Sequence, residues 1–542
     1  MGENKNKKDV PHKVYELWEV MEKLGKYQIM QYVYVCFGTI FVTIMNINYI
    51  FLAGDLNYRC RIPECESINA TFESPPWESG LSIDRCSKPI LNKNFSQAQT
   101  CTADSFSSLV EPCMAWVYES NNTIVADLDL ACQPLKVSLV GTIHSIGMLV
   151  SMLTAGWLAD RYGRKPALVF CVVGTCVGHV KTFAKSYYLY VAIDWLEAAL
   201  SGGAYPAGMV LMLEISGKKH RLLSSVLFAY AIYLGESLFA VLAMFVPYWK
   251  TLARIIYTPG ILCLSLIWLI TESPRWQLLN GKTDKAIETL RFTAKVNNMK
   301  INDVITELDG EKLKTKLNIG KSVATESYKK IFSSKHILIR LLVGVVSRFT
   351  ASFVYYGLMV NSVWLPGNKY TNFLLSTVMS FPGELISLYL MNKIGRKLPL
   401  IVGFTICGML CIGSGYVPAT IVWLKITLFL LGKVMIASCY TGSVTYSMEL
   451  FPTNARGALL GVCAFASILG NMLAPLTPML YTISGSLPAI LFGISAVVTA
   501  SLITLTPETK ELPLFDTVEQ VEASMKTKPR QIEKETTISA IA

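Results

Sequence analysis

A short basic turn between two apolar segments constrains this chain more than any other feature of its sequence. Residues 156–165 read G-W-L-A-D-R-Y-G-R-K and join the apolar segments Val137–Leu158 and Pro166–Phe183. Glycine allows the backbone angles of a tight reversal, and an excess of Arg and Lys in a short loop marks the cytoplasmic side of a membrane. The pattern predicts two membrane helices joined by a tight cytoplasmic turn.

A weaker copy of this turn indicates that the chain is a duplication. Residues 392–397 read N-K-I-G-R-K and lie 232 residues after D-R-Y-G-R-K at 160–165. Two acids recur at nearly the same offset, Glu214 with Glu449 at 235 residues and Glu272 with Glu508 at 236 residues. Offsets of this length fit six membrane helices repeated in parallel about an axis along the membrane normal.

The apolar segments predict an all-α membrane protein with twelve transmembrane helices in two parallel six-helix repeats, residues 28–271 and 337–505. Segments of about 20 residues are long enough to cross a hydrocarbon core of roughly 30 Å. The predicted helices are Gln28–Phe51, Val137–Leu158, Pro166–Phe183, Tyr187–Met209, Leu222–Phe245, Leu252–Thr271, Ile337–Val360, Thr371–Met391, Leu398–Tyr416, Thr420–Ser447, Ala458–Leu480 and Leu487–Leu505.

A polar loop at 52–136 follows the first predicted helix. It holds six of the fourteen cysteines, an even set that predicts three disulfides in an oxidising compartment and leaves fifteen connectivities open. It also holds three N-glycosylation acceptors, Asn69, Asn94 and Asn121. We therefore expect an extracellular loop, which is also where we expect a homo-oligomer contact. The six cysteines are Cys60, Cys65, Cys86, Cys101, Cys113 and Cys132.

Composition and charge agree with a membrane protein. Hydrophobic residues make up 52% of the chain and charged residues 16%, which excludes a soluble globular protein. The net charge of +11 comes from basic residues at the ends of apolar segments, so no nucleic-acid partner is predicted. Residues 1–27, 272–336 and 506–542 are polar and lysine-bearing, so we expect these segments and both termini in the cytoplasm. Asp284–Val296 and Ile301–Leu313 have the apolar spacing of short amphipathic helices.

Ionisable side chains inside the predicted spans are candidates for solute binding, because each costs a few kcal/mol near the bilayer centre. Glu236 and Arg348 lie midway along their helices, the depth at which duplicated transporters bind solutes. They could bind solute, or they could neutralise one another or Glu384 as an internal ion pair. Asp194 and Glu197 are three residues apart, so they share one helix face and could bind a cation or a proton.

Other polar residues of the spans have simpler interpretations beside the functional ones. Lys425 lies near a helix end and can snorkel. His144 could shuttle protons, although hydrogen bonding to a neighbouring helix is commoner for a lone membrane histidine. Tyrosines on the cavity-lining helices offer cation-π surfaces for organic ammonium groups, and Tyr205 and Tyr355 are the best candidates. The full set is Tyr205, Tyr230, Tyr233, Tyr355 and Tyr356.

Together the motifs resemble the organic-ion transporters of the major facilitator superfamily, which carry organic cations, carnitine and organic anions and include insect organic cation transporters. The resemblance covers about residues 27–517 and adds E-S-P-R-W at 272–276, E-L-F-P-T-N-A-R at 449–456 and P-E-T-K at 507–510 to the two turns. It implies a plasma-membrane transporter that works by alternating access, with a cytoplasmic gate of charged side chains. The implied gating residues are Asp160, Arg161, Arg164, Glu214, Arg221, Glu272, Arg275, Lys393, Arg396, Glu449, Arg456 and Glu508.

The sequence departs from this family at the positions that set solute charge. Ile468 lies seven residues before Pro475, where cation carriers have an aspartate and anion carriers an arginine. Ser380 replaces an acid of helix 8, and Asp194 replaces a usual arginine. Asn392 replaces the acid of the second turn, so we expect a gate that is stronger in the first half.

The leading hypothesis is a transporter of small organic cations or zwitterions, such as carnitine-like or amine solutes, with Glu236 and Glu384 opposite Arg348. The alternatives are an organic anion exchanger that uses Arg348 and a non-transporting receptor or scaffold. No phosphate-binding loop, metal-ligand spacing or nucleophile-base set is present in the sequence, so we predict no enzyme activity, cofactor or metal.

Overall fold

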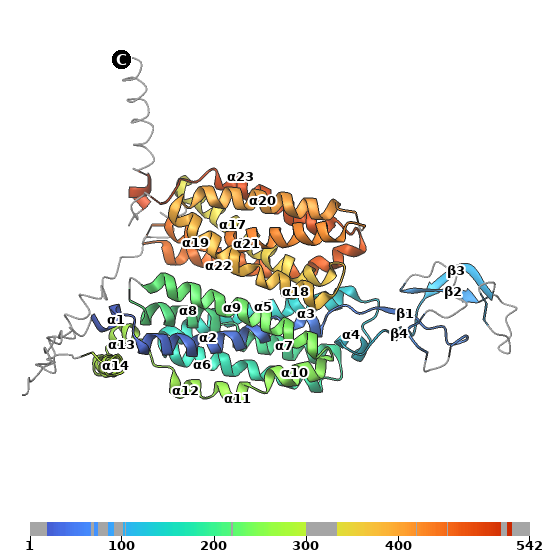
Figure 1. The fold of residues 1–542 in the computed structure, drawn as a ribbon, viewed down its shortest axis with the longest axis horizontal. Coiled ribbons are helices and arrows are strands. Elements are labelled where there is room, and N and C mark those ends of the chain that lie inside the picture. The colour runs from blue at the N-terminus through green and yellow to red at the C-terminus, as the bar shows by residue number, and fades with distance from the viewer. Residues whose placement is uncertain are drawn as a thin grey trace, which may run out of the picture.

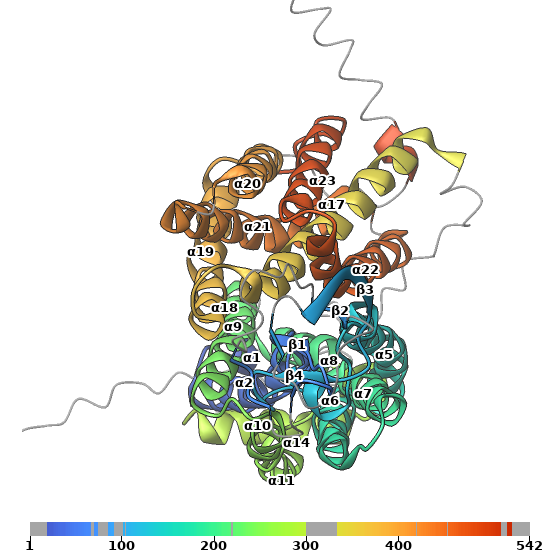
Figure 2. The same cartoon turned by 90° about the vertical axis from the view of Figure 1, so that its right-hand side faces the viewer.

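Two helical bundles lie side by side, and a small strand-bearing region projects from one end of the first (Figure 1). Viewed from that end, the helices of the two bundles form two separate groups (Figure 2). The computed structural model describes residues 19–66, 70–73, 85–91, 101–102, 105–217, 220–299, 333–418, 420–452, 454–510 and 518–522.

The first bundle follows the six predicted spans, and four of them consist of two or three helices. Gly202 and Gly203 separate the two parts of the fourth span. The backbone of the second span packs closely against Gly202, since an added Cβ at this position would lie 3.0 Å from Met148 Cα. The helices are α2 (Lys26–Asn46), α3 (Tyr49–Leu52), α5 (Pro134–Arg161), α6 (Arg164–Gly174), η3 (Thr175–Phe183), α7 (Tyr187–Ser201), α8 (Ala204–Ile215), α9 (Arg221–Phe245), α10 (Trp249–Tyr257), α11 (Gly260–Cys263) and α12 (Leu266–Leu269).

The second bundle repeats this arrangement. Its helices are α17 (Lys335–Asn361), η5 (Ser362–Trp364), α18 (Lys369–Val378), α19 (Ser380–Lys393), α20 (Lys397–Tyr416), α21 (Val422–Leu450), α22 (Arg456–Leu473), η6 (Ala474–Thr482) and α23 (Leu487–Ile503). Ten spans are long and apolar enough to cross a membrane within the described residues. The sixth span is broken near Pro259, which has no N–H for a helical bond, and α23 has 17 residues. The twelve-span layout is confirmed.

Each bundle has a hydrophobic core, and a few residues of the opposite bundle pack into it. Val172, Leu211 and Phe239 are buried in the first core, and Phe404 and Phe492 in the second. Large apolar side chains also cover the outside of the bundles, as at Leu153, Phe245 and Trp268. An apolar exterior of this extent requires a lipid environment.

The loop between the first two spans forms two small antiparallel sheets. Strand β1 (Tyr58–Cys60) pairs with β4 (Trp116–Tyr118), and β2 (Ser87–Leu91) pairs with β3 (Phe106–Pro112). All six predicted cysteines form disulfides, so the prediction of three bridges is confirmed. The bridges are Cys60–Cys113, Cys65–Cys101 and Cys86–Cys132. Asn121 is exposed, while Asn69 and Asn94 lie outside the described residues.

Three short helices lie at the opposite end from the strands, α1 (Glu19–Glu22), α13 (Pro274–Leu279) and α14 (Thr283–Val296) (Figure 1). The backbone N–H of Tyr27 donates to Asn297 Oδ1 at 2.9 Å, which ties the segment after α14 to the start of the first span. The amphipathic helix predicted at Asp284–Val296 is confirmed. The second, predicted at Ile301–Leu313, lies outside the described residues.

The Cys86–Cys132 bridge gives a first prediction. It closes a separation of 46 residues, so replacing both cysteines with serine should destabilise the loop by about 4 kcal/mol through the added chain entropy of the unfolded state. Thermal unfolding of the purified protein without reductant measures this effect. Cys36→Ser, at a free cysteine, is the control, and equal melting curves for the two variants would contradict the prediction.

Candidate functional site

The two bundles contact each other mainly at the strand-bearing end. There Thr142 Oγ1 donates to Met472 O at 3.1 Å, and the Phe51 ring stacks on Tyr370 with centroids 5.0 Å apart. Ser237 and Thr377 share a hydroxyl bond of 3.1 Å nearer the middle. The halves therefore meet at the end that carries the disulfide-bonded loop, where residues of both halves and of the loop line a cavity of about 530 Å³.

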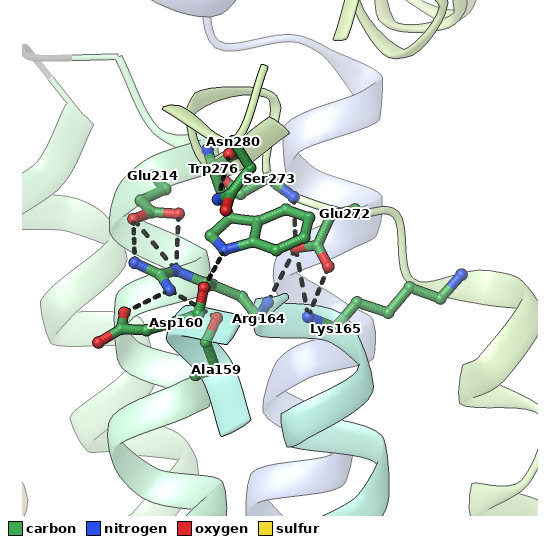
Figure 3. Close-up of polar contacts among 9 residues, drawn as sticks. All are labelled: Ala159, Asp160, Arg164, Lys165, Glu214, Glu272, Ser273, Trp276 and Asn280. Atoms are coloured by element: carbon green, nitrogen blue, oxygen red, sulfur yellow. Dashed lines mark hydrogen bonds and ion pairs between the residues drawn. The ribbon is translucent and has the colours of Figure 1, made fainter. Parts of the chain in front are cut away.

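The charged turn of the first half lies at the other end, and its bonds stay within that half (Figure 3). Arg164 Nη1 donates to Asp160 Oδ1 at 2.8 Å, and its Nε and Nη2 lie 3.3 Å from the Glu214 carboxylate. Glu272 Oε1 accepts the backbone N–H of Arg164 at 3.0 Å and that of Lys165 at 3.3 Å. Glu272 therefore caps the start of α6, where free N–H groups favour a negative charge.

Gly163 makes this arrangement sterically feasible. Its φ is +125° and its ψ 162°, a region that is essentially restricted to glycine. A Cβ at this position would lie 2.0 Å from Glu272 Oε2. The carboxylate can therefore reach the helix start only because residue 163 has no side chain.

The second half repeats the same contacts. Arg396 Nε donates to Glu449 Oε1 at 3.1 Å, and Glu508 accepts the backbone N–H of Arg396 at 2.8 Å and of Lys397 at 2.9 Å. Gly395 takes the place of Gly163 with φ +144°. The ion pair of Arg164 with Asp160 has no counterpart, because residue 392 is asparagine.

The two capping glutamates differ in their acidity. Burial raises the pKa of the Glu272 carboxyl above its ordinary value, although the backbone N–H groups that it accepts act in the opposite direction. Burial also acts to raise the pKa of Glu508, but its backbone donors outweigh burial and hold this pKa below the ordinary value. Glu272 therefore takes up a proton at a higher pH than Glu508 does.

Five other predicted gating residues lie around these turns with different contacts. Arg161 is exposed and its guanidinium lies over the Trp157 ring at 5.5 Å. Lys393 Nζ donates to Tyr389 OH at 3.0 Å, and Arg456 Nε donates to Phe451 O at 3.3 Å at the end of α21. Arg221 is exposed at the start of α9, and Arg275 is half-buried in α13.

Two crossed hydrogen bonds join the halves near the middle of the membrane. Tyr355 OH of α17 donates to Glu236 Oε2 of α9 at 3.2 Å, and Tyr233 OH of α9 donates to Glu384 Oε2 of α19 at 3.2 Å. Each half thus supplies one acid and one tyrosine. We call these four residues and Lys433 the central cluster, and all five are buried.

Further polar groups hold the central cluster in place. Ser380 Oγ lies 3.2 Å from Tyr355 OH, and Thr441 Oγ1 donates to Glu384 Oε2 at 2.5 Å. Lys433 Nζ donates to the backbone carbonyl of Tyr355 at 3.0 Å and lies 3.2 Å from the centre of its ring. The Tyr355 ring is therefore already covered by the Lys433 amine in this conformation.

Arg348 does not form an ion pair with Glu236 or Glu384 in this conformation. Its guanidinium lies over the ring of Tyr440 at 5.4 Å. Its Nη1 is a buried nitrogen with no hydrogen-bond partner. A donor of this kind is costly to leave unpaired and is suited to an acceptor from a ligand.

Asp194 and Glu197 share a partner that the sequence analysis missed. Lys181 Nζ lies 2.6 Å from Asp194 Oδ1 and 2.6 Å from Glu197 Oε2, and all three side chains are buried within the first half. Lys181 lies two residues before the end of the predicted third span, where a lysine is expected to reach the membrane surface. Two acids on one face of the next helix were the signal that a buried cation was needed.

Half-buried aromatic rings surround the central cluster. Tyr230 lies 5.1 Å from Phe381, and Phe381 lies 5.6 Å from Tyr233, measured between ring centres. Tyr205 and Tyr356 are also half-buried. The five predicted tyrosines therefore gather at the interface between the halves.

The family described as sugar (and other) transporter matches residues 94–520. The chain belongs to the sugar (and other) transporter family. Solute carrier family 22 member 3 of Rattus norvegicus is 28% identical over 524 residues, which cover 92% of this chain and 94% of that protein. The organic cation transporter protein of Drosophila melanogaster is 28% identical over 519 residues, with 92% and 93% covered.

A solved transporter structure shares the fold. The xylose transporter XylE from E. coli, in a partially occluded inward-open conformation, matches with a TM-score of 0.60 at 15% identity and covers 90% of this chain and 100% of that chain. The protein is accordingly a multi-pass membrane transporter of the major facilitator fold and not an enzyme. Among the described residues, the hydrogen bonds that join the halves lie at the strand-bearing end and midway along the helices, while the charged turns bond within their own halves.

The turn geometry generates the second prediction. Gly163→Ala should cost about 1–3 kcal/mol in backbone strain and displace Glu272 from the start of α6, so the amount of folded transporter at the cell surface should fall. Gly156→Ala is the matched control, because an added Cβ there meets nothing within 4 Å. Surface biotinylation and thermal stability of the two variants measure the effect. Equal values would show that the Glu272 carboxylate can cap α6 with a side chain present at residue 163.

Proposed function

We propose that this transporter carries small organic cations or zwitterions across the plasma membrane by alternating access, with the central cluster as its recognition site. The observation that carries the proposal is the carboxylate of Glu384, which accepts two hydroxyl hydrogen bonds and lies beside the aromatic rings of Tyr233, Tyr230 and Phe381. A carboxylate next to aromatic faces is the chemistry that recognises an organic ammonium group.

The crossed hydrogen bonds suggest how binding and movement are linked. A cation that approaches Glu236 or Glu384 competes with the tyrosine hydroxyl that the opposite half donates. Binding therefore weakens a contact between the halves at the depth where they must separate. The cation brings a full positive charge to the carboxylate in place of an uncharged hydroxyl donor, and this attraction is weakly screened in a buried site, so the exchange favours the bound state.

Arg348 supports a carboxylate-bearing solute. Its unpartnered Nη1 supplies a donor on α17, the helix that also carries Tyr355. In a zwitterion such as carnitine the ammonium group would bind the acids and the carboxylate would bind Arg348. The same unpartnered donor favours the second candidate function, an organic anion exchanger centred on Arg348. The names of the relatives, which include an organic cation transporter protein, support a cation.

Neutralising the acids tests the main proposal. Glu384→Gln and Glu236→Gln keep the side-chain shape but remove the charge, so uptake of labelled tetraethylammonium should fall by about 10- to 100-fold, the equivalent of the 1.5–3 kcal/mol of a hydrogen bond to a charged group. Glu288→Gln, on the exposed face of α14, should leave uptake unchanged. Wild-type cells that accumulate organic anions but neither tetraethylammonium nor carnitine would overturn the assignment.

Arg348 distinguishes the solute classes. Arg348→Gln should raise the KM for carnitine by about tenfold or more and leave that for tetraethylammonium within about twofold, because only carnitine has a carboxylate for the guanidinium. An equal loss for both solutes, together with low surface expression, would indicate a structural role for Arg348. Loss of anion uptake alone would support the exchanger.

A further inference from the structure

A cavity of about 530 Å³ lies between the halves at the strand-bearing end, and the recognition site proposed above does not use it. A volume of this size accommodates a small organic molecule. The three disulfides of the adjoining loop belong to an oxidising compartment, which is the outside of the cell in the proposed function. The cavity is therefore placed to receive a ligand that arrives from outside.

One wall of the cavity belongs to the first half and its loop. Asp55 follows α3, and Tyr58 lies in β1. The Tyr58 hydroxyl accepts the backbone N–H of Cys132 at 3.0 Å, and Cys132 lies two residues before the start of α5. The loop is also fixed to the sixth span, because Lys250 Nζ lies 2.5 Å from Asp127 Oδ2. This wall therefore moves with the first half.

The opposite wall belongs to the second half. Trp364 of η5 and Tyr481 of η6 line it, and their rings are stacked with centres 5.6 Å apart. Val360 and Met479 add apolar surface to the same wall. Trp364 is 40% exposed, so a ligand can cover part of its surface. A flat aromatic group is the part of a ligand that suits this wall.

The charged groups of the cavity favour a cation. Of the described residues that line it, Asp55 and Arg85 carry charge. Arg85 Nη1 lies 3.7 Å from Asp55 Oδ2, which is longer than a hydrogen bond, and Arg85 Nη2 donates to Asn57 Oδ1 at 2.9 Å. The Arg85 side chain is 53% exposed and the Asp55 side chain 29%, so water screens the arginine more than the aspartate. The Asp55 carboxylate and the Tyr58 ring of this wall therefore attract an ammonium group.

The two halves thus supply different parts of one site. A molecule that carries an ammonium group on an aromatic ring matches both walls at once. Alternating access requires the halves to rock apart at this end in every cycle, and a ligand that contacts both walls then loses one set of its contacts. Such a ligand binds more tightly to the joined arrangement and shifts the equilibrium towards it.

We propose that this cavity binds an aromatic organic cation from outside, with its ammonium group against Asp55 and Tyr58 and its ring against Trp364 and Tyr481, and that the bound molecule inhibits transport by holding the halves together. This inference rests on the transport function proposed above. The inhibition is not competitive, because the solute binds at the central cluster and the carrier passes through the joined arrangement in every cycle. A high solute concentration therefore does not relieve it.

Uptake of labelled tetraethylammonium by expressing cells tests the inhibition, with benzyltrimethylammonium added outside as the aromatic cation. It should lower Vmax at saturating solute, and tetramethylammonium, which lacks the ring, should be weaker by about tenfold or more. Trp364→Leu and Asp55→Asn should each raise the inhibitory concentration by about tenfold or more and leave the KM for tetraethylammonium within about twofold. Trp423→Leu, at an exposed tryptophan that does not line the cavity, should behave as the wild type.

Labelling of a cysteine in the cavity measures binding without transport. Thr482 is an exposed residue of the lining, so Thr482→Cys should react with the membrane-impermeant reagent trimethylammonium-ethyl methanethiosulfonate, and the wild type gives the background from other cysteines. Benzyltrimethylammonium should slow this reaction by about threefold or more by occupying the cavity. The protection should persist when Glu384→Gln is added, because the central cluster does not form this site.

The outcomes separate this site from the transport function. Unchanged inhibition in Trp364→Leu and Asp55→Asn, or competitive inhibition without protection of Thr482→Cys, would overturn the site and leave the transport function standing. Protection by benzoate in place of the cation would overturn the assigned charge. Protection in cells that take up neither tetraethylammonium nor carnitine would support the binding site and overturn the proposed transport function, and with it the inhibition.

Discussion

The architecture depends on a carboxylate that accepts backbone N–H groups at the start of a helix. Glu272 does this for α6, and Glu508 does it for α20. Each glutamate comes from the segment after the last span of its half, so the bond joins the end of a six-helix unit to its second turn. Each half is thereby tied together at the end that carries its charged turn.

The two halves differ at this point less than the sequence suggests. Asn392 replaces the acid that Asp160 supplies to Arg164, and we expected a stronger first gate for that reason. The Asp160 side chain, however, is 81% exposed, and an ion pair with so exposed a partner contributes about 1 kcal/mol or less. Both halves keep the arginine-glutamate contact and the capping bond, and these two contacts contribute most of the attraction between the turn and the helix ends.

The sequence predicted the parts of the structure that local rules control. Twelve spans, the duplication and the six paired cysteines follow from apolar length, repeated motifs and an even cysteine count in one loop. The breaks in the spans were not predicted, because tertiary packing decides where glycine or proline interrupts a helix. The sequence also showed which charged residues lie inside the spans, but it did not show which residues they contact.

The partners depend on contacts between distant segments. Glu236 was expected to interact with solute or with Arg348, but it accepts from Tyr355, which is 119 residues away. Lys181 was overlooked because its position near a helix end suggested the membrane surface, while in the structure its Nζ lies 2.6 Å from Asp194 Oδ1. No periodicity in one chain encodes such pairings, so only the three-dimensional arrangement could assign them.

The crossed tyrosine-glutamate bonds also have a consequence for inhibition. Each acid accepts a hydrogen bond from a hydroxyl of the opposite half. A molecule that binds only one acid therefore leaves the other tyrosine-glutamate bond between the halves intact. Such a molecule would lock the two halves at an intermediate opening and would block turnover more strongly than its affinity alone suggests. The length of the ligand, and not only its charge, would then decide whether it is carried or trapped.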